Sequence, residues 1–437
     1  MSYPVADPAL TAFAARLGGL RTPDPSRARI LEIGCASGHN LLALAMRWPE
    51  AKLVGVDLAV DAIAHARRRA EEAGISNVTF HAADLREAEL EAGSFDYIIA
   101  HGFLSWVPDE VKDILFTTCT RLLAPSGIAT ISFNLACGWR DRAPVIAAAM
   151  EIQRERNLDE IQALEILLPT AEDDYTKWII NDMLAKGPRI LPFDDFGPVN
   201  DPWPLDRFVA AASAAGLRWL GESDPAENIP AVLDDEARAV LLPLARDPLR
   251  MQTVADELAR RTFRSCVLCH ADAPLEKVST SLVLDYSVRI GKRTNGGWHG
   301  VMEPFAKILA SREPQSVPVR EIIEDMGEVD LPALARAIID AIIKGGLKVM
   351  SEPVRYHPEP ISPCELDPFR LLCAREKIPL VDAWLVSCAF PDHHYELLAE
   401  MDGSKSIAEL ALRAEKLCPD LVFMPWLQHL AGRGMFA

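Results

Sequence analysis

Residues 29–38 read RILEIGCASG, a short apolar run that ends in a turn of small residues. The run Arg29–Ile33 has the length and apolar character of a buried strand, and Gly34–Gly38 follows it directly. Small residues at alternate positions let the backbone turn sharply and approach a ligand closely. The stretch therefore predicts the first strand of an α/β sheet, with a ligand-binding turn at its end.

The same pattern continues through the first 135 residues as alternating strands and helices, which is typical of a parallel, doubly wound sheet. We expect four further strands, at Lys52–Val56, Val78–Ala82, Phe95–Ala100 and Gly127–Phe133. We expect three helices between them, at Asn40–Trp48, Asp61–Ala73 and Pro108–Leu123. In such sheets ligands bind at the carboxyl ends of the strands.

Two carboxylates follow the next two strands. Asp57 ends the second strand about 20 residues after the turn, where a carboxylate can accept both hydroxyls of a ribose. Asp84 follows the third strand and can hold an adenine amino group. A nicotinamide cofactor would require glycine at position 36, where this chain has Ala36, whereas S-adenosylmethionine has no phosphate and tolerates alanine. The residues favour S-adenosylmethionine; a domain of the same fold without a ligand is the alternative.

Four stretches of this region resemble class I S-adenosylmethionine-dependent methyltransferases: LEIGCASGHN, VGVDLA, FDYIIAHGFLSWVP and GIATISFNLACGW. Two later stretches, 192–224 and 260–272, resemble the methyltransferase regulatory domain of a family that includes bacterial outer-membrane-protein lysine methyltransferases. The resemblance covers about residues 1–285. It implies a Rossmann-like doubly wound sheet, a mostly helical middle region and a winged-helix-like C-terminal domain.

The predicted cofactor site surrounds the ends of the first four strands. Its residues are Glu32, Gly34, Cys35, Ala36, Gly38, Asn40, Asp57, Leu58, Asp84, Leu85 and His101. Tyr3 lies in a segment that can fold over the cofactor as a lid.

Three residues are predicted to be catalytic. His101 is placed to act as a base or to bond the amino-acid part of the cofactor, although a strand-end histidine can simply hold a backbone carbonyl. Trp106 can wall the methyl-transfer channel and stack on a cationic substrate, or only pack. Asn134 can orient a substrate amine, or form an Asx turn.

The chain departs from the family pattern at segments that can face a substrate. His39 stands where a second glycine is usual, and Phe193 and Gly197 stand at positions of His and Glu. The segment FNLACGW (133–139) replaces a more aromatic form that contains proline. These departures leave the cofactor assignment intact and leave the substrate open.

Charge narrows the range of partners. The 437 residues carry a formal net charge of −18, and residues 151–240 alone carry 8 basic and 19 acidic groups. Nucleic-acid binding needs clustered positive charge, so we expect no nucleic-acid partner. The acidic middle segment can attract a cationic substrate by long-range steering, or can be only a solvated surface. A homodimer is possible.

The apolar runs and the cysteines indicate where in the cell the protein is located. No run approaches the roughly 18 apolar residues of a membrane span, and the first residues lack a signal-peptide pattern. Nine scattered cysteines suit reduced thiols, so we expect a cytoplasmic protein without a membrane partner.

No metal site is predicted. Cys266-Val-Leu-Cys269-His270 matches the haem c attachment pattern formally, but attachment occurs in exported proteins. A zinc knuckle would need a second pair of ligands near it. His393-His394 has no partnering cysteine pair.

We expect three domains: a cofactor-binding domain at 1–145, a regulatory or substrate domain at 146–295, and a winged-helix-like domain at 296–437. The joints are expected at Ala143-Pro144 and Lys292–Gly297. Residues 331–356 read as a helix, a glycine stop and a short strand. The C-terminal domain carries 14 basic and 21 acidic groups, which favours protein contact or dimerisation over DNA reading.

These observations predict an S-adenosylmethionine-dependent methyltransferase that N-methylates lysine side chains of a protein. One alternative is a methyltransferase that acts on N or O atoms of a small molecule. A second alternative is a binding protein that senses S-adenosylmethionine.

Overall fold

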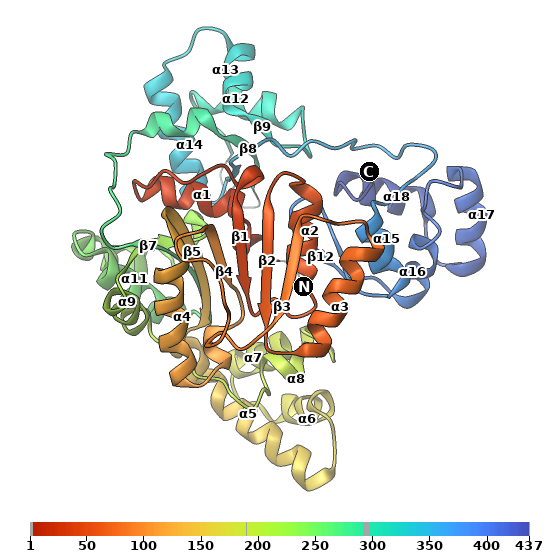
Figure 1. The fold of residues 1–437 in the computed structure, drawn as a ribbon, viewed down its shortest axis with the longest axis horizontal. Helices are drawn as coiled ribbons and strands as arrows, with labels where there is room; N and C mark the ends of the chain where they lie inside the picture. Colours follow the sequence, from red (N-terminus) through yellow and green to blue (C-terminus); the bar gives the residue numbers. More distant parts are fainter. Residues whose placement is uncertain (1–2, 189, 292–296, 437) are drawn as a thin grey trace.

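A seven-stranded sheet forms the centre of the computed structural model, which describes residues 3–188, 190–291 and 297–436 (Figure 1). The strand order is β3-β2-β1-β4-β5-β7-β6. The first five strands in this order are parallel, and β7 runs antiparallel to both of its neighbours. The strands are β1 Arg29–Ile33, β2 Lys52–Asp57, β3 Val78–Ala82, β4 Phe95–Ala100, β5 Leu123–Asn134, β6 Leu217–Glu222 and β7 Phe263–His270.

The predicted α/β pattern of the first 135 residues is confirmed. The helices between the strands are α2 His39–Arg47, α3 Val60–Glu72 and α4 Asp109–Leu122, and each bound lies within one residue of its prediction. The fifth strand is longer than predicted, because β5 begins at Leu123 rather than at Gly127.

Both faces of the sheet are buried at its central strands. Alternate residues of β1 and β2 enter two different apolar clusters: Ile30 packs in one with Leu53, and Leu31 packs in the other with Val56. Helices α2 and α3 cover the first face together with α1 (Pro8–Leu17), and α4 covers the second. Such two-sided burial explains why these strands read as short continuous apolar runs.

The middle region completes the sheet with β6 and β7, which the sequence analysis did not predict. β7 carries the fully buried Arg264, whose charge needs partners inside the protein. Its guanidinium Nε and Nη2 donate to Asp256 at 2.8 and 2.9 Å, and Nη1 donates to Glu222 at 2.8 Å and to Gln252 at 2.9 Å. Paired in this way, the charge can be buried, whereas losing one partner would leave an uncompensated buried ion.

Helices of the middle region lie below the carboxyl ends of the parallel strands in Figure 1, where α7 and α8 are labelled. The predicted joint Ala143-Pro144 lies inside α5, so the chain does not leave its helix there. The helices of the region are α5 Ala136–Arg156, α6 Glu160–Leu167, α7 Asp174–Ala185, α8 Leu191–Asp194, α9 Leu205–Ala214, α10 Asp235–Leu241 and α11 Pro248–Ala259.

The C-terminal part has two portions. One joins the strands β10-β8-β9 to three helices and packs against α1 through Leu10 and Phe13. Its elements are β8 Ser287–Ile290, α12 Met302–Ala310, β9 Val317–Pro318, α13 Val319–Met326, α14 Leu331–Ile343 and β10 Leu347–Met350. The predicted helix, glycine stop and strand are therefore present, whereas the winged-helix assignment stays a prediction. Residues 292–296 of the second predicted joint lie outside the described residues.

The other portion lies beside α3 in Figure 1. Glu376 fixes it there by ion pairs to Arg68 at 2.6 Å and Arg69 at 2.7 Å. Its elements are α15 Pro368–Arg375, β11 Leu380–Val381, β12 Ser387–Cys388, α16 Asp392–Leu398, α17 Ile407–Leu417 and α18 Phe423–Gly432. None of the helices in the described part of the chain combines the length and apolar character needed to cross a bilayer.

Short 3₁₀ helices connect these elements: η1 Pro4–Ala6, η2 Pro25–Arg27, η3 Leu104–Trp106, η4 Leu168–Thr170, η5 Pro225–Glu227, η6 Leu242–Leu244 and η7 Thr280–Asp285.

Candidate active site

The turn after β1 has a backbone that only small residues allow. Gly34 and Gly38 have φ angles of 74° and 73°, in the left-handed region. A Cβ on Gly34 would lie 2.7 Å from the Phe103 ring, and one on Gly38 would lie 2.6 Å from the Phe80 ring. Both positions therefore require glycine for conformation and for space. Ala36, between them, is also left-handed at φ 46° and is exposed, so the turn presents open backbone.

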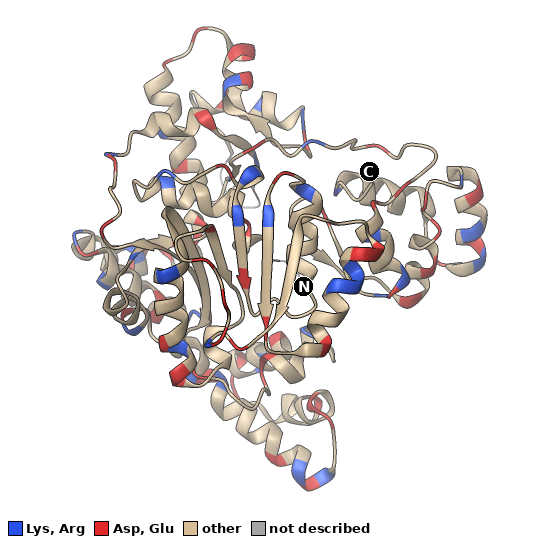
Figure 2. Ribbon diagram, in the orientation of Figure 1, with Lys and Arg blue, Asp and Glu red and all other residues tan. Residues whose placement is uncertain are grey.

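Asp57, at the end of β2, faces this turn. Its Oδ2 accepts the backbone N–H of Ala36 at 2.8 Å, and its Oδ1 accepts that of Ala59 at 2.8 Å. A carboxylate oxygen has two lone-pair positions, so each oxygen keeps one position for a further donor. The carboxylate is thus held in place with its acceptor capacity half used. Figure 2 shows acidic residues at the lower ends of both β1 and β2.

Glu32, in β1, is buried, and only one of its two carboxylate oxygens accepts a hydrogen bond. Its Oε1 accepts Asn40 Nδ2 at 3.2 Å, while Oε2 is buried without a hydrogen-bond partner among the described residues. Burial raises the pKa of this carboxyl to about 8. A buried acceptor without a donor costs about 1–3 kcal/mol. A cationic amino group brought by a ligand would supply the missing donor and charge.

Asp84 is less available than the sequence suggested. Its Oδ1 accepts the backbone N–H of Arg86 at 2.9 Å and the Nε at 2.8 Å, and Oδ2 pairs with the Arg86 guanidinium. This pairing holds the pKa of Asp84 at about 2. The adjacent Leu85 is buried, whereas Leu58, after Asp57, is 68% exposed.

The other predicted cofactor residues surround this turn. Cys35 is buried, and burial raises the pKa of its thiol, so it is neutral. Asn40 and His39 are buried in the first turn of α2. Burial lowers the pKa of His39 to about 3, which makes this departure from the family pattern an uncharged packed side chain.

His101, just after β4, lies under an aromatic cover. Its ring centroid is 4.2 Å from that of Tyr3 and 5.7 Å from that of Phe263. Its Nδ1 is buried and has no hydrogen-bond partner among the described residues, so this nitrogen does not hold a backbone carbonyl. Burial lowers the pKa of His101 to about 4 against the opposing charge of Asp194. The imidazole is therefore neutral at physiological pH.

Asn134 ends β5 and connects the sheet to the middle region. Its backbone N–H donates to Ser105 Oγ at 2.9 Å, and its Nδ2 donates to Asn200 Oδ1 at 3.0 Å. Its backbone carbonyl accepts the N–H of Trp203 at 2.9 Å. Because Oδ1 accepts no hydrogen bond from the described residues, it is the atom of this side chain that can still receive a donor.

Trp106 packs against the segment after α8. A Cβ on Gly197 would lie 3.1 Å from the Trp106 ring and 2.9 Å from the Phe193 carbonyl oxygen, so glycine suits this contact. Phe193 itself is 77% exposed. The two departures at 193 and 197 therefore have different surroundings, one beside Trp106 and one open to solvent.

Asp194 is a member of the site that the sequence analysis missed. Its charge acts on both Tyr3 and His101. Lys186 Nζ holds it at 2.5 Å and holds the buried Asp195 at 2.6 Å, and Arg142 Nη1 contacts Asp195 at 3.2 Å. The acidic pair in the quoted 192–224 stretch was the available signal, but only the fold brings it to His101.

Comparisons with known protein families match two regions of the chain. Residues 30–127 match the family model of a methyltransferase domain, and residues 188–270 match the model described as a predicted methyltransferase regulatory domain. The site lies between them, because Glu32, Asp57 and His101 belong to the first region and Asp194 and Phe263 to the second. The predicted resemblance is confirmed.

Among curated relatives, an uncharacterized protein of Rickettsia prowazekii, RP789, is 30% identical over 291 residues, which cover 63% of this chain and 52% of that protein. A trans-aconitate 2-methyltransferase of Azoarcus is 32% identical over 111 residues, or 25% of this chain and 41% of that enzyme. This chain spans about half the length of the first curated relatives that it matches, 52% to 64%.

The fold is shared over nearly the whole chain with a solved structure. PKMT2 from Rickettsia typhi in complex with AdoHcy has a TM-score of 0.83, with 19% identity, 99% of this chain and 98% of that chain covered. A second structure of PKMT2 from Rickettsia typhi has a TM-score of 0.84, with 20% identity, 100% of this chain and 99% of that chain covered. These likenesses confirm the α/β fold class.

Proposed function

We propose that this chain, which combines a methyltransferase domain with a methyltransferase regulatory domain, transfers methyl groups from S-adenosylmethionine to lysine side chains of a protein. The observation that carries the proposal is the pair of carboxylates at neighbouring strand ends. Glu32 offers a buried acceptor without a donor, and Asp57 offers acceptors held by two backbone amides.

The residues present fit the cofactor. Asp57 would accept the two ribose hydroxyls, and Glu32 would pair with the cationic amino group. Asp84 would accept from the adenine amino group only by sharing its oxygens with Arg86. S-adenosylmethionine has no pyrophosphate, so the turn can carry Ala36 where a dinucleotide would need glycine.

When bound, S-adenosylmethionine supplies an activated methyl group and its own leaving group. What the chain must do is orient the acceptor, exclude water and favour a neutral amine. Tyr3 covers His101 and so keeps solvent from it. Asn134 Oδ1 can accept from the amine and fix its direction.

His101 is better suited to accept a hydrogen bond than to act as a general base. A lysine amine has an ordinary pKa near 10.4, and the pKa of His101 is about 4. Moving a proton between groups so mismatched costs roughly 9 kcal/mol. We therefore propose that desolvation lowers the pKa of the entering amine, that the amine gives its proton to solvent, and that neutral His101 then accepts a hydrogen bond from its remaining N–H.

Two observations support a protein as the acceptor, beside the fold shared with the solved structure named PKMT2. The middle region is acidic, and an acidic surface suits a cationic side chain such as that of lysine. Phe193 is 77% exposed, so its aromatic ring is open to contact with a macromolecular acceptor.

We propose several further properties together with this function. They are the domain division at 145 and 295, the roles of Trp106 and the other site residues, a homodimer, and a cytoplasmic location. The absence of a nucleic-acid partner also stays a prediction. The alternatives are a small-molecule acceptor and a sensor without turnover.

The product decides between these functions. The full chain would be incubated with S-adenosylmethionine and a purified lysine-rich fragment of a bacterial outer-membrane protein, and separately with lysine amide and with trans-aconitate. We expect increments of 14 Da on lysines of the protein only. Methylation of a small molecule alone would support the first alternative, and binding without any product would support the second. Asp57→Ala should abolish the product, and Asp61→Ala, at an exposed position of α3, is its control and should keep wild-type activity.

A further inference from the structure

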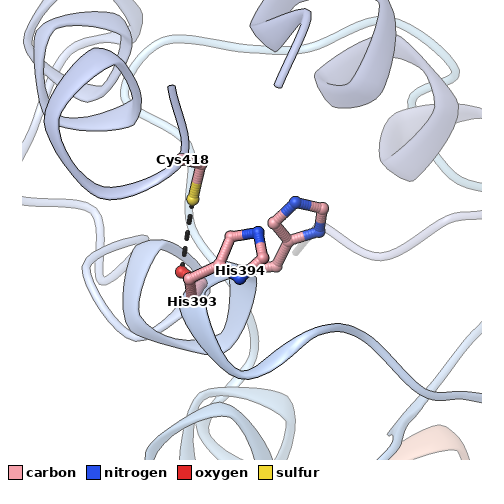
Figure 3. A group of neighbouring side chains, drawn as sticks. All are labelled: His393, His394 and Cys418. Atoms are coloured by element: carbon pink, nitrogen blue, oxygen red, sulfur yellow. Dashed lines mark hydrogen bonds between the residues drawn. The ribbon is translucent and has the colours of Figure 1, made fainter. Parts of the chain in front are cut away.

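Three side chains with metal-ligand chemistry meet in the C-terminal portion (Figure 3). His393 and His394 occupy the first turn of α16, and Cys418 follows α17. One nitrogen of each imidazole and the Cys418 Sγ all lie within 4.8 Å of one another. Because Cys418 is 25 positions from His393, only the packing of α16 against α17 brings them together.

The current bonding of this cluster is incomplete. Cys418 is buried, and its Sγ donates only to the His393 carbonyl oxygen, at 3.3 Å. The Nδ1 of His394 is buried and has no hydrogen-bond partner among the described residues. The Trp426 ring lies against the His394 ring, at 5.5 Å between centroids, and makes no hydrogen bond to that nitrogen. A buried nitrogen with no partner costs about 1–3 kcal/mol, and a bound ion would supply the partner.

We propose that His393, His394 and Cys418 bind one transition-metal ion, and that the ion is Zn²⁺. Imidazole and thiolate are the ligands that zinc takes in proteins, whereas Ca²⁺ and Mg²⁺ require oxygen ligands. Three protein ligands leave the fourth tetrahedral position for water. This site is separate from the proposed methyl-transfer function and takes no part in it.

Binding requires a small rearrangement. Ligand atoms at about 2.0–2.3 Å from zinc lie roughly 3.5 Å apart in a tetrahedron, so the cluster must contract by about 1 Å. His393 is exposed, and its side chain can rotate without disturbing the core. The Cys418 thiol gives its proton to solvent and becomes the thiolate ligand, and the His393 carbonyl exchanges that donor for water.

The bound ion would join the start of α16 to the end of α17. These helices belong to the portion that Glu376 attaches to α3 by its ion pairs with Arg68 and Arg69. Because a metal that binds only the folded state stabilises it, the ion is expected to raise the unfolding temperature of this portion.

The test uses the full chain, stripped with a chelator and titrated with Co²⁺ as a spectroscopic probe and then with Zn²⁺. We expect one equivalent of Co²⁺ to produce a thiolate charge-transfer band and tetrahedral visible bands, which Zn²⁺ then abolishes. Cys418→Ser removes the charge-transfer band, and His394→Ala lowers Zn²⁺ affinity by more than about 100-fold, beyond the effect of losing an outer partner. Cys388→Ser, at a partly exposed thiol of the same portion, keeps the wild-type bands.

Some variants of buried residues can fail to fold, so His393→Ala supplies the second arm at an exposed position. Weaker Zn²⁺ binding by His393→Ala, with wild-type S-adenosylmethionine binding as the folding check, would support the site. The proposal is overturned if wild-type chain shows no saturable Co²⁺ band, or if His393→Ala and Cys388→Ser bind Zn²⁺ equally well.

Discussion

The carboxylate of Asp57 accepts the backbone N–H of Ala36 at 2.8 Å and thereby joins residues 21 positions apart. Ala36 has a left-handed φ of 46°, which is unfavourable for a residue with a Cβ. The same carboxylate thus stabilises the strained turn and, in our proposal, receives the ribose. Its two roles can be separated by measuring stability and binding in the same variant.

Asp57→Ala removes both roles. We expect S-adenosylmethionine affinity to fall by at least about 100-fold, since two charge-assisted hydrogen bonds of about 1.5–3 kcal/mol each are lost. The unfolding free energy should fall by only about 1 kcal/mol. Calorimetric titration and urea unfolding measure the two quantities. Asp61→Ala is the control for charge at this end of the molecule, and unchanged affinity in Asp57→Ala would remove Asp57 from the ribose role.

Gly34→Ala tests the space beside the turn. The added Cβ would lie 2.7 Å from the Phe103 ring at a φ of 74°. Gly74→Ala is the matched control, because Gly74 has a φ of 66° with nothing within 4 Å of an added Cβ. The control should lose about 1–2 kcal/mol of stability from backbone conformation alone. Gly34→Ala should lose more stability and also cofactor affinity; equal losses in the two variants would show that the contact with Phe103 is unimportant.

Glu32→Gln tests a pH dependence. Burial raises the pKa of Glu32 to about 8 in the folded chain, above its ordinary value of 4.5. Since the folded pKa is the higher one, ionisation destabilises the fold. The cost appears as pH rises above 4.5 and is complete near 8. At pH 7 it amounts to about 3 kcal/mol.

The variant should therefore lose less stability than the wild type between pH 5 and pH 8 in urea unfolding. Cofactor affinity of the wild type should rise from pH 6 to 7.5, because the cationic amino group prefers ionised Glu32, and the variant should bind weakly at every pH. Glu50→Gln, at an exposed side chain, should behave like the wild type in both measurements. A wild-type affinity independent of pH would argue against the pairing.

His101→Ala should lower kcat more than it changes cofactor affinity. Since the pKa of His101 is about 4, the pH profile of kcat/KM should show no histidine step between pH 6 and 9 and should follow the amine instead. His65→Ala, on the exposed face of α3, is the control. A step near pH 6.5 that disappears in His101→Gln would show that His101 acts as a base.

The sequence predicted the parallel half of the sheet because its strands are continuous apolar runs bounded by glycine, proline and aspartate. The antiparallel strands β6 and β7 were not predicted. β7 includes the charged Arg264, and its burial depends on Asp256 and Glu222, whose approach is set by tertiary packing.

The site was predictable in part for a similar reason. Glu32, Asp57 and His101 follow strands of one sheet edge, so topology alone brings them together. Tyr3 was recognised only as part of a lid, and the electrostatic effect of Asp194 on His101 was not predicted. The pairing of Asp84 with Arg86 also escaped prediction, because a local ion pair and a ligand acceptor have the same sequence signal.

Binding of S-adenosylmethionine at the strand ends is tested most directly by calorimetric titration of the full chain with S-adenosylmethionine and, separately, with NADH. We expect micromolar binding of S-adenosylmethionine alone, and we expect Asp57→Ala to lose it. Binding of NADH with comparable affinity, or no heat with S-adenosylmethionine, would show that the strand ends are not a site for S-adenosylmethionine.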